Sequence, residues 1–257
     1  MLRFPLRLTA ELTRARLAQK SHPALSAVRF VDAAELLHHH ANQPISHERI
    51  REIISSRSPV VWIGGSEPLD HPGVAHLVRA ITGSGHFVFL ETDGTTLRRR
   101  IHEFQPLPRF FLTVRWDAGP RLPRSKSLQP SSSELAEEGV RAAQLSGFLI
   151  CFHARVHAQT ELAAIAELIQ YAHSLDVDGI VVSPGSAGSH RTVPDAAALQ
   201  RKTAEARKLI GSKWWEFFSR LIDPVVNGER RALESPDESA ARVEPEVPAS
   251  GEGVRVA

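Results

Sequence analysis

Polar residues and glycines follow five apolar runs of this sequence, at the point where each run ends. In chain order they are Gly64, Gly65, Ser66, Glu67 and Pro68; Glu91, Thr92, Asp93 and Gly94; Arg115 and Asp117; His153, Arg155 and His157; and Ser183, Pro184, Gly185, Ser186 and Gly188. If the runs are parallel strands, their carboxyl ends meet at one edge of a sheet, where ligands bind in α/β folds. We therefore expect these residues to form one site.

Two of the runs alternate in a way that places charge on one face of the sheet. In "FLICFHARV" (148–156) Cys151, His153 and Arg155 share one face, and in "FFLTVRWD" (110–117) Arg115 and Asp117 do so. Buried charges are costly unless they are paired or used. Two interpretations stay open, a structural ion pair beside a satisfied histidine, or a binding pocket lined by Glu91, Arg115, Asp117, His153 and Arg155.

Glycines and histidines suggest other ligands more weakly. Gly64 and Gly65 directly after a strand would let backbone N–H groups approach an anion, and "SPGSAGS" (183–189) could do the same, although tight turns also require glycine. His38, His39 and His40 are consecutive, so on a helix they point in different directions and form a poor ligand set. We predict no metal site.

The arrangement of the runs predicts an α/β fold. Six apolar runs, each followed by a helix-like stretch, occupy 24–32, 59–65, 86–94, 110–116, 148–156 and 178–185. Such alternation is typical of βα units around a parallel sheet. Nearly continuous apolar runs such as "HFVFL" indicate strands that are covered on both faces. The pattern fits either a doubly wound sheet or a partial barrel.

Composition limits the class of protein. The chain has 257 residues, 42% of them apolar and 23% charged, with a net charge of +2, which is typical of a soluble globular protein. One cysteine excludes a disulfide and any site that takes several cysteines from this chain. No apolar run approaches the length of a membrane span, and Arg3, Arg7 and Glu11 interrupt the N-terminus, so we expect a cytoplasmic protein. No aromatic residues interleave with the basic ones, so we expect no nucleic-acid partner.

Three regions are predicted along the chain. Residues 1–22 hold a basic amphipathic helix that packs on the domain, with weak contact to a membrane surface through residues 5–20 as the alternative. Residues 23–226 form the α/β unit, and the Pro/Ser-rich stretch 117–134 is a long connection within it. Residues 227–257 have few large apolar side chains and are expected to be a disordered acidic tail.

Several motifs together resemble the radical SAM superfamily. "GSEPLDHP" (65–72) is similar to the Gly-Gly-Glu-Pro motif that ends strand two in that family, with Ser66 in place of a glycine. "ETDGTTL" (91–97) and "TVRWDAG" (113–119) resemble the ends of its strands three and four. The resemblance covers about residues 24–212 and implies a partial (βα)6 TIM-like barrel, followed by a closing helix at "KWWEFFSRLIDPVV" and the tail.

The resemblance also implies S-adenosylmethionine as a possible cofactor. Gly65, Ser66, Glu67 and Pro68 would contact its methionyl amino group, and Thr92, Asp93 and Gly94 would lie nearby at the mouth of the barrel. Arg115 and Asp117 would face the ribose. The loop that begins with Ser183 and Pro184 and runs to Gly188 would flank the adenine.

One departure from the family changes the expected chemistry. The family places C-x3-C-x2-C after strand one to bind a [4Fe–4S] cluster, but residues 32–46 contain no cysteine and Cys151 lies on strand five. We therefore expect no cluster. The main hypothesis is a degenerate, non-radical binding or regulatory pseudoenzyme, whose partner is a cysteine-containing radical SAM homologue or a small anionic metabolite. The alternatives are an acid–base enzyme that uses His153 or Asp117 on an anionic small molecule, and an active radical SAM enzyme with atypical cluster ligation.

Overall fold

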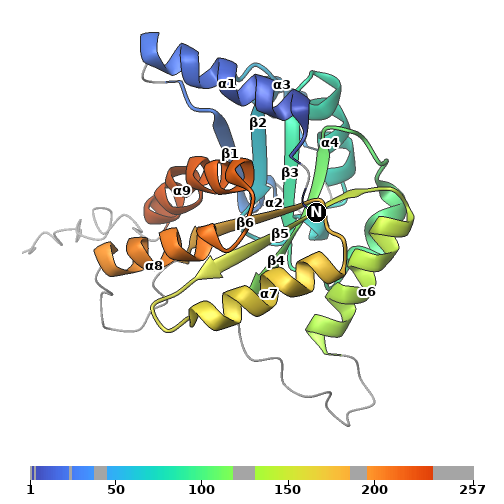
Figure 1. Cartoon of the computed structure of the whole chain (residues 1–257). Coiled ribbons are helices and arrows are strands. Elements are labelled where there is room, and N and C mark those ends of the chain that lie inside the picture. The colour runs from blue at the N-terminus through green and yellow to red at the C-terminus, as the bar shows by residue number, and fades with distance from the viewer. Residues whose placement is uncertain are drawn as a thin grey trace, which may run out of the picture.

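A computed structural model describes residues 2, 4–22, 25–37, 45–117, 131–185 and 196–233. Its centre is one sheet of six parallel strands in the order of the sequence, β1 (Val28–Asp32), β2 (Val60–Gly64), β3 (Phe87–Thr92), β4 (Phe110–Asp117), β5 (Leu149–Val156) and β6 (Gly179–Pro184). The sheet curls into a half-barrel (Figure 1). The predicted partial (βα)6 barrel is confirmed, and the doubly wound alternative is excluded because no strand order reverses.

At least one helix follows each strand, and these helices cover the outside of the sheet (Figure 1). They are α2 (Ala33–Leu37), α3 (His47–Ile54), α4 (Val74–Gly83), α5 (Leu97–Arg100), α6 (Ser132–Leu145), α7 (Leu162–Ser174) and α8 (Ala196–Lys208), with short 3₁₀ turns η1 (Pro68–Asp70) and η2 (Ile101–Glu103). Local sequence explains their starts. The Ser46 hydroxyl accepts from the Arg49 N–H at 3.2 Å, and Ser131 and Glu134 form a capping box.

The concave face of the sheet is filled with aromatic rings in its amino-terminal half. Phe89 stacks on Trp62 and on Phe111, with ring centroids 5.5 Å and 4.6 Å apart. Trp215 and Phe218 of helix α9 (Lys213–Leu233) close this layer from the other side, and α9 contacts both β6 and β1. The rings leave only the carboxyl-terminal half of the half-barrel for polar groups.

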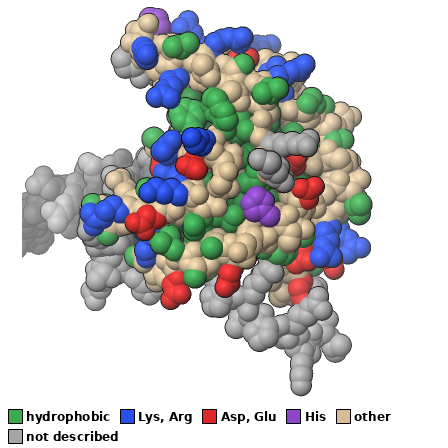
Figure 2. All heavy atoms as spheres, viewed as in Figure 1, with side chains coloured by type: hydrophobic (Ala, Val, Ile, Leu, Met, Phe, Trp, Pro, Cys, Tyr) green, Lys and Arg blue, Asp and Glu red, His purple; other side chains and the backbone are tan. Residues whose placement is uncertain are grey.

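Helix α1 (Leu6–Ser21) packs on the half-barrel through Leu8 and Leu12, as the sequence predicts. Its basic side chains gather at the top of the molecule in Figure 2. None of the helices in the described ranges has the length and apolar character needed to cross a membrane. Contact of α1 with a membrane surface and the boundaries at residues 22 and 226 stay predictions, and residues 234–257 lie outside the described part.

Gly179 provides a test of how tightly α9 packs. A Cβ at this position would overlap the ring of Trp215, so Gly179→Ala forces the helix away from β6. We expect the free energy of unfolding to fall by about 1–3 kcal/mol. Gly83→Ala is the matched control, because nothing lies within 4 Å of its added Cβ and alanine favours the helix. Urea unfolding of both variants measures this, and equal stability would contradict the packing.

Candidate functional site

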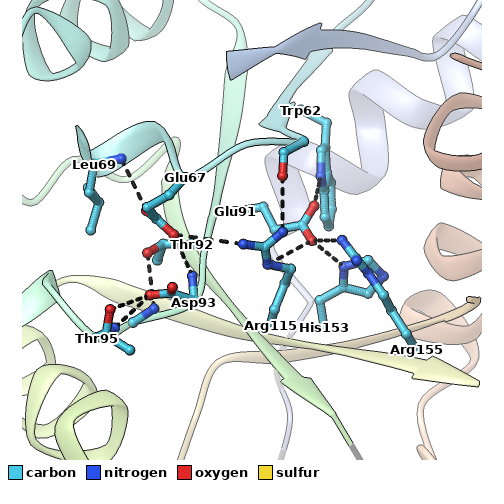
Figure 3. A network of polar contacts seen from close by, with 12 residues as sticks. Trp62, Glu67, Leu69, Glu91, Thr92, Asp93, Thr95, Arg115, His153 and Arg155 are labelled. Atoms are coloured by element: carbon cyan, nitrogen blue, oxygen red, sulfur yellow. Dashed lines mark hydrogen bonds and ion pairs between the residues drawn. The ribbon is translucent and has the colours of Figure 1, made fainter. Parts of the chain in front are cut away.

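Glu91 lies at the centre of the polar half of the barrel (Figure 3). It is the penultimate residue of β3, and its side chain is only 1% exposed. The Trp62 indole N–H donates to one carboxylate oxygen at 2.8 Å. The other oxygen faces His153 Nδ1 at 3.3 Å, accepts from the Arg155 guanidinium, and lies 3.7 Å from Nε of Arg115. Strands β2, β4 and β5 therefore all direct side chains at this carboxylate.

These partners keep Glu91 ionised inside the protein. Burial by itself raises the pKa of a carboxyl group, because a low dielectric disfavours the charged form. His153, Arg155 and Arg115 more than offset this burial and hold the pKa of Glu91 well below its usual value. The position of each side chain along its strand predicted that it lies in the pocket. The sequence did not predict that all three converge on one carboxylate.

Arg115 connects Glu91 to the loop after β2. Its guanidinium donates to the backbone carbonyl of Gly65 at 3.1 Å and lies 3.8 Å from the carboxylate of Glu67. Its side chain is 21% exposed, so part of the guanidinium reaches the mouth of the barrel. A cation from β4 thus binds the loop that, by resemblance, would contact the amino group of a cofactor.

Glu67 is occupied by contacts within the protein. Its carboxylate accepts from the backbone N–H of Leu69 at 3.1 Å, from the backbone N–H of Asp93 at 2.8 Å, and from the hydroxyl of Thr92. Burial raises the pKa of Glu67, and these donors oppose the rise. Asp93 in turn accepts from the Thr95 N–H and hydroxyl, each at 2.8 Å. Glu67 therefore fastens the loop after β2 to the end of β3.

Close approach explains both glycines after β2. A Cβ on Gly64 would lie 2.7 Å from a carboxylate oxygen of Glu91. Gly65 has φ +87°, which favours glycine, and a Cβ there would overlap the carboxylate of Asp32. Asp32 is buried at the end of β1, where it accepts from the Ala34 N–H at 2.7 Å. The buried carboxylates of Glu91 and Asp32 therefore leave no room for a side chain at either glycine.

The His-Pro pair of "GSEPLDHP" forms a turn. His71 is 1% exposed, and its Nδ1 accepts from the backbone N–H of Gly73 at 2.9 Å, directly before α4. Its backbone carbonyl accepts from Arg100. Both contacts fix the entry of the chain into α4, so this part of the motif has a structural reason of its own.

His153 also forms a hydrogen bond with Ser183. Ser183, His153 and Glu91 therefore follow one another as the three groups of a Ser–His–acid triad do. The Ser183 hydroxyl lies 2.7 Å from His153 Nε2, and His153 Nδ1 faces Glu91. Neither Ser183 nor His153 has exposed surface, so no substrate atom can reach the hydroxyl in this conformation. The arrangement therefore orients the imidazole toward Glu91, and accessibility argues against a nucleophilic serine.

The structure brings together most, but not all, of the expected site residues. Glu91, Arg115, His153, Arg155 and Ser183 form one network, which Arg115 joins to Glu67, Thr92 and Asp93. The backbone of Asp117 pairs with that of Arg155, but its side chain is outside the described part, as are Ser186, Gly188 and His38, His39 and His40. His157 lies apart, against Gly185.

Sequence reasoning missed two residues of the site, Trp62 and Asp32. Trp62 lies two positions before Gly64 in β2, so the alternation of the strand places both on the face of Glu91. That alternation was available in the sequence but was hidden in a continuous apolar run. Asp32 is a polar residue at the end of the first apolar run, and this position could have predicted that it lies at the site.

The side chains do not fit a [4Fe–4S] cluster. The whole sequence has one cysteine, Cys151, where the cluster needs three thiolates. Cys151 is buried on β5, and burial together with Asp178 raises the pKa of its thiol well above the usual value, which disfavours a thiolate ligand. Among the described residues no group of three or more His, Cys, Asp or Glu side chains is placed to hold a metal ion.

Comparison with known proteins finds similar solved structures but no sequence match. No protein-family model matches the chain, and no curated protein matches it in sequence. Two similar solved structures are TYW1 with a lysine-pyruvate adduct bound (15% identity, TM-score 0.43, covering 66% of this chain and 54% of that chain) and Streptococcus suis SuiB bound to S-adenosylmethionine (13%, 0.47, 77% and 51%).

The chain spans about half the length of each of these two structures. At identities of 13% and 15% and TM-scores below 0.5, neither match carries an argument about this chain. Binding and chemistry must therefore be argued from the side chains of this chain.

Glu91→Gln tests the central carboxylate. The substitution leaves two guanidiniums without their shared anion, so we expect the free energy of unfolding at pH 7 to fall by about 3 kcal/mol. Because the pKa of Glu91 is lowered in the folded state, its stabilisation is present above pH 4.5, the usual carboxyl value, and is lost as the pH falls below it. The difference between wild type and variant should therefore shrink from pH 5 to pH 3.

Urea unfolding across this pH range measures the difference. Glu138→Gln is the control, since Glu138 pairs with Arg98 at the surface and is 50% exposed. A difference that stays constant with pH would show that Glu91 is not the ionised centre of the network.

Proposed function

We propose that this protein is a radical-SAM-type barrel that binds a small anionic molecule at the carboxyl ends of its strands and holds no iron–sulfur cluster of its own. The observation that carries the proposal is the position of Arg115. Its guanidinium lies on the Gly65 carbonyl and beside Glu67, so the loop already has a cation from within the chain. An incoming ammonium group would have to displace it.

The polar groups at the mouth that are not fully used by contacts within the protein are hydrogen-bond donors. Glu91 and Glu67 are each surrounded by several donors, and their lone pairs are largely used. A guanidinium has five N–H donors, and Nε of Arg155 is buried with no hydrogen-bond partner among the described residues. Arg155 is 13% exposed. Unused donors on two guanidiniums favour a carboxylate or phosphate, which they can bind in a bidentate manner.

S-adenosylmethionine is a weaker candidate on the same reasoning. Gly65, Ser66, Glu67 and Pro68 keep the order of the family motif, and Thr92, Asp93, Gly94, Ser183 and Pro184 would complete its site by resemblance. Without iron to bind its amino and carboxyl groups, the cofactor would depend on these residues alone. Its ammonium would compete with Arg115 for Gly65 and Glu67. We propose a regulatory role, in the cytoplasm, beside a cysteine-containing homologue that carries the radical chemistry.

Acid–base catalysis by His153 or Asp117 stays a prediction. His153 has both ring nitrogens engaged, and neither His153 nor Ser183 has exposed surface, so no substrate proton can reach the imidazole in this conformation. This makes binding the better-supported function of the site.

Calorimetry on Arg115→Ala tests the proposed ligand class. Wild type should bind citrate or inorganic phosphate more tightly than S-adenosylmethionine. Removing one charged donor should weaken the anion about tenfold or more, whereas S-adenosylmethionine should bind at least as well, because Gly65 and Glu67 become free. Arg98→Ala, at an exposed surface pair, is the control and should change neither affinity. Unchanged anion binding in a folded Arg115→Ala would refute the proposal.

Anaerobic reconstitution with iron and sulfide tests the absence of a cluster. We expect no absorbance near 400 nm and no electron paramagnetic resonance signal after reduction, since three thiolates are lacking. Cys151→Ser should behave as wild type does. Uptake of about four irons with cleavage of S-adenosylmethionine would establish the atypical active enzyme instead.

A further inference from the structure

A second cavity lies at the opposite end of the barrel from the mouth. It has a volume of about 550 Å³, within the range of about 300–1,000 Å³ typical of small-molecule sites. Four segments form its walls, namely the inward side of α1, the approach to β1 at His22 and Leu25, the turn before β2 at residues 57–59, and the turn before β3 at residues 84–86. It therefore lies where the strands begin, away from Glu91.

Hydrogen bonds between these segments keep the cavity open. The Gln19 amide donates to the Leu25 carbonyl at 2.6 Å and fastens α1 to the segment before β1. The Ser58 hydroxyl donates to the Ser26 carbonyl at 2.8 Å and joins the starts of β1 and β2. The ring of His86 lies between the carbonyls of Ser58 and Ile54, at 2.8 Å and 3.1 Å. The walls are thus fixed before any ligand arrives, which lowers the entropic cost of binding.

The lining combines an apolar wall with an excess of positive charge. Ala15, Ala18, Leu25 and Pro59 supply the apolar part. Two guanidiniums, Arg14 and Arg57, stand against the single carboxylate of Glu11, which already accepts from Arg14 at 3.0 Å.

Arg57 is the unused cation of this cavity. It is exposed and has no hydrogen bond or ion pair within the described part of the chain. Nothing in the barrel requires its charge at this place. A free guanidinium beside a preformed apolar wall is suited to a ligand that brings both an anionic group and an apolar body.

We propose that this cavity is a binding site for a small amphipathic anion, such as an aromatic carboxylate, sulfonate or phosphate ester. The apolar body would lie against Ala15, Ala18 and Pro59, and the anionic group would bind Arg57. Because reactions in barrels of this kind take place at the carboxyl ends of the strands, a ligand at the amino ends is bound and not transformed. The site is independent of the proposed function of the mouth.

Titration with 8-anilinonaphthalene-1-sulfonate, an aromatic sulfonate, tests the proposal by fluorescence and calorimetry. We expect saturable binding of one molecule to the folded protein. Arg57→Ala should weaken binding about tenfold through loss of a charged hydrogen bond, and folding should be unaffected because Arg57 has no partner to lose among the described residues. Ala18→Leu should also weaken it by filling the cavity, while leucine keeps α1 helical.

Arg79→Ala is the matched control. Arg79 is also exposed, but it lines a separate cavity of about 410 Å³ beside Thr82, Leu107 and Arg109. We expect wild-type affinity for this variant. Wild-type affinity in both Arg57→Ala and Ala18→Leu, loss in Arg79→Ala alone, or no saturable binding to the native protein would each overturn the proposal.

Discussion

The polar half of this barrel depends on a single buried charge. The carboxylate of Glu91 is removed from water at a cost of several kcal/mol unless other groups replace its hydration. Trp62, His153 and Arg155 do so by direct contact, and Arg115 adds a charge at 3.7 Å. These groups come from three strands, so the carboxylate is satisfied only when β2 to β5 pair in their native register.

The need to compensate the charge of Glu91 also determines the structure of the loops at the mouth. Arg115 extends from Glu91 to Gly65 and Glu67, and Glu67 extends to the backbone at Asp93. Gly64 must lack a side chain because the Glu91 carboxylate occupies that space. Part of a motif that resembles a cofactor-binding loop therefore has a structural explanation in this chain. The charge that binds the loop from within is also the reason why we propose an anion as the ligand of the mouth.

The aromatic layer below Glu91 separates the two ends of the barrel. Trp62, Phe89 and Phe111 form a continuous stack, and α9 covers it with Trp215 and Phe218. This layer excludes water from the underside of the carboxylate, which strengthens the interactions above it. It also leaves the amino ends of the strands to form a second cavity with α1, whose lining shares no residue with the Glu91 network.

The sequence by itself determined the fold class and most members of the site. Alternating apolar runs and helices predict six parallel βα units, and parallel strands must end at one edge, so Glu91, Arg115, His153 and Arg155 had to lie near one another. The single cysteine excluded a three-thiolate cluster without any structure. Only the tertiary structure decided that several cations share the carboxylate of Glu91 and that Arg57 has no partner within the described residues. The partners of a charged group depend on the register and curl of the strands. The contact of Trp62 with Glu91 depends on this arrangement, and so does the cavity around Arg57, whose walls come from residues 11–22, 25, 57–59 and 84–86.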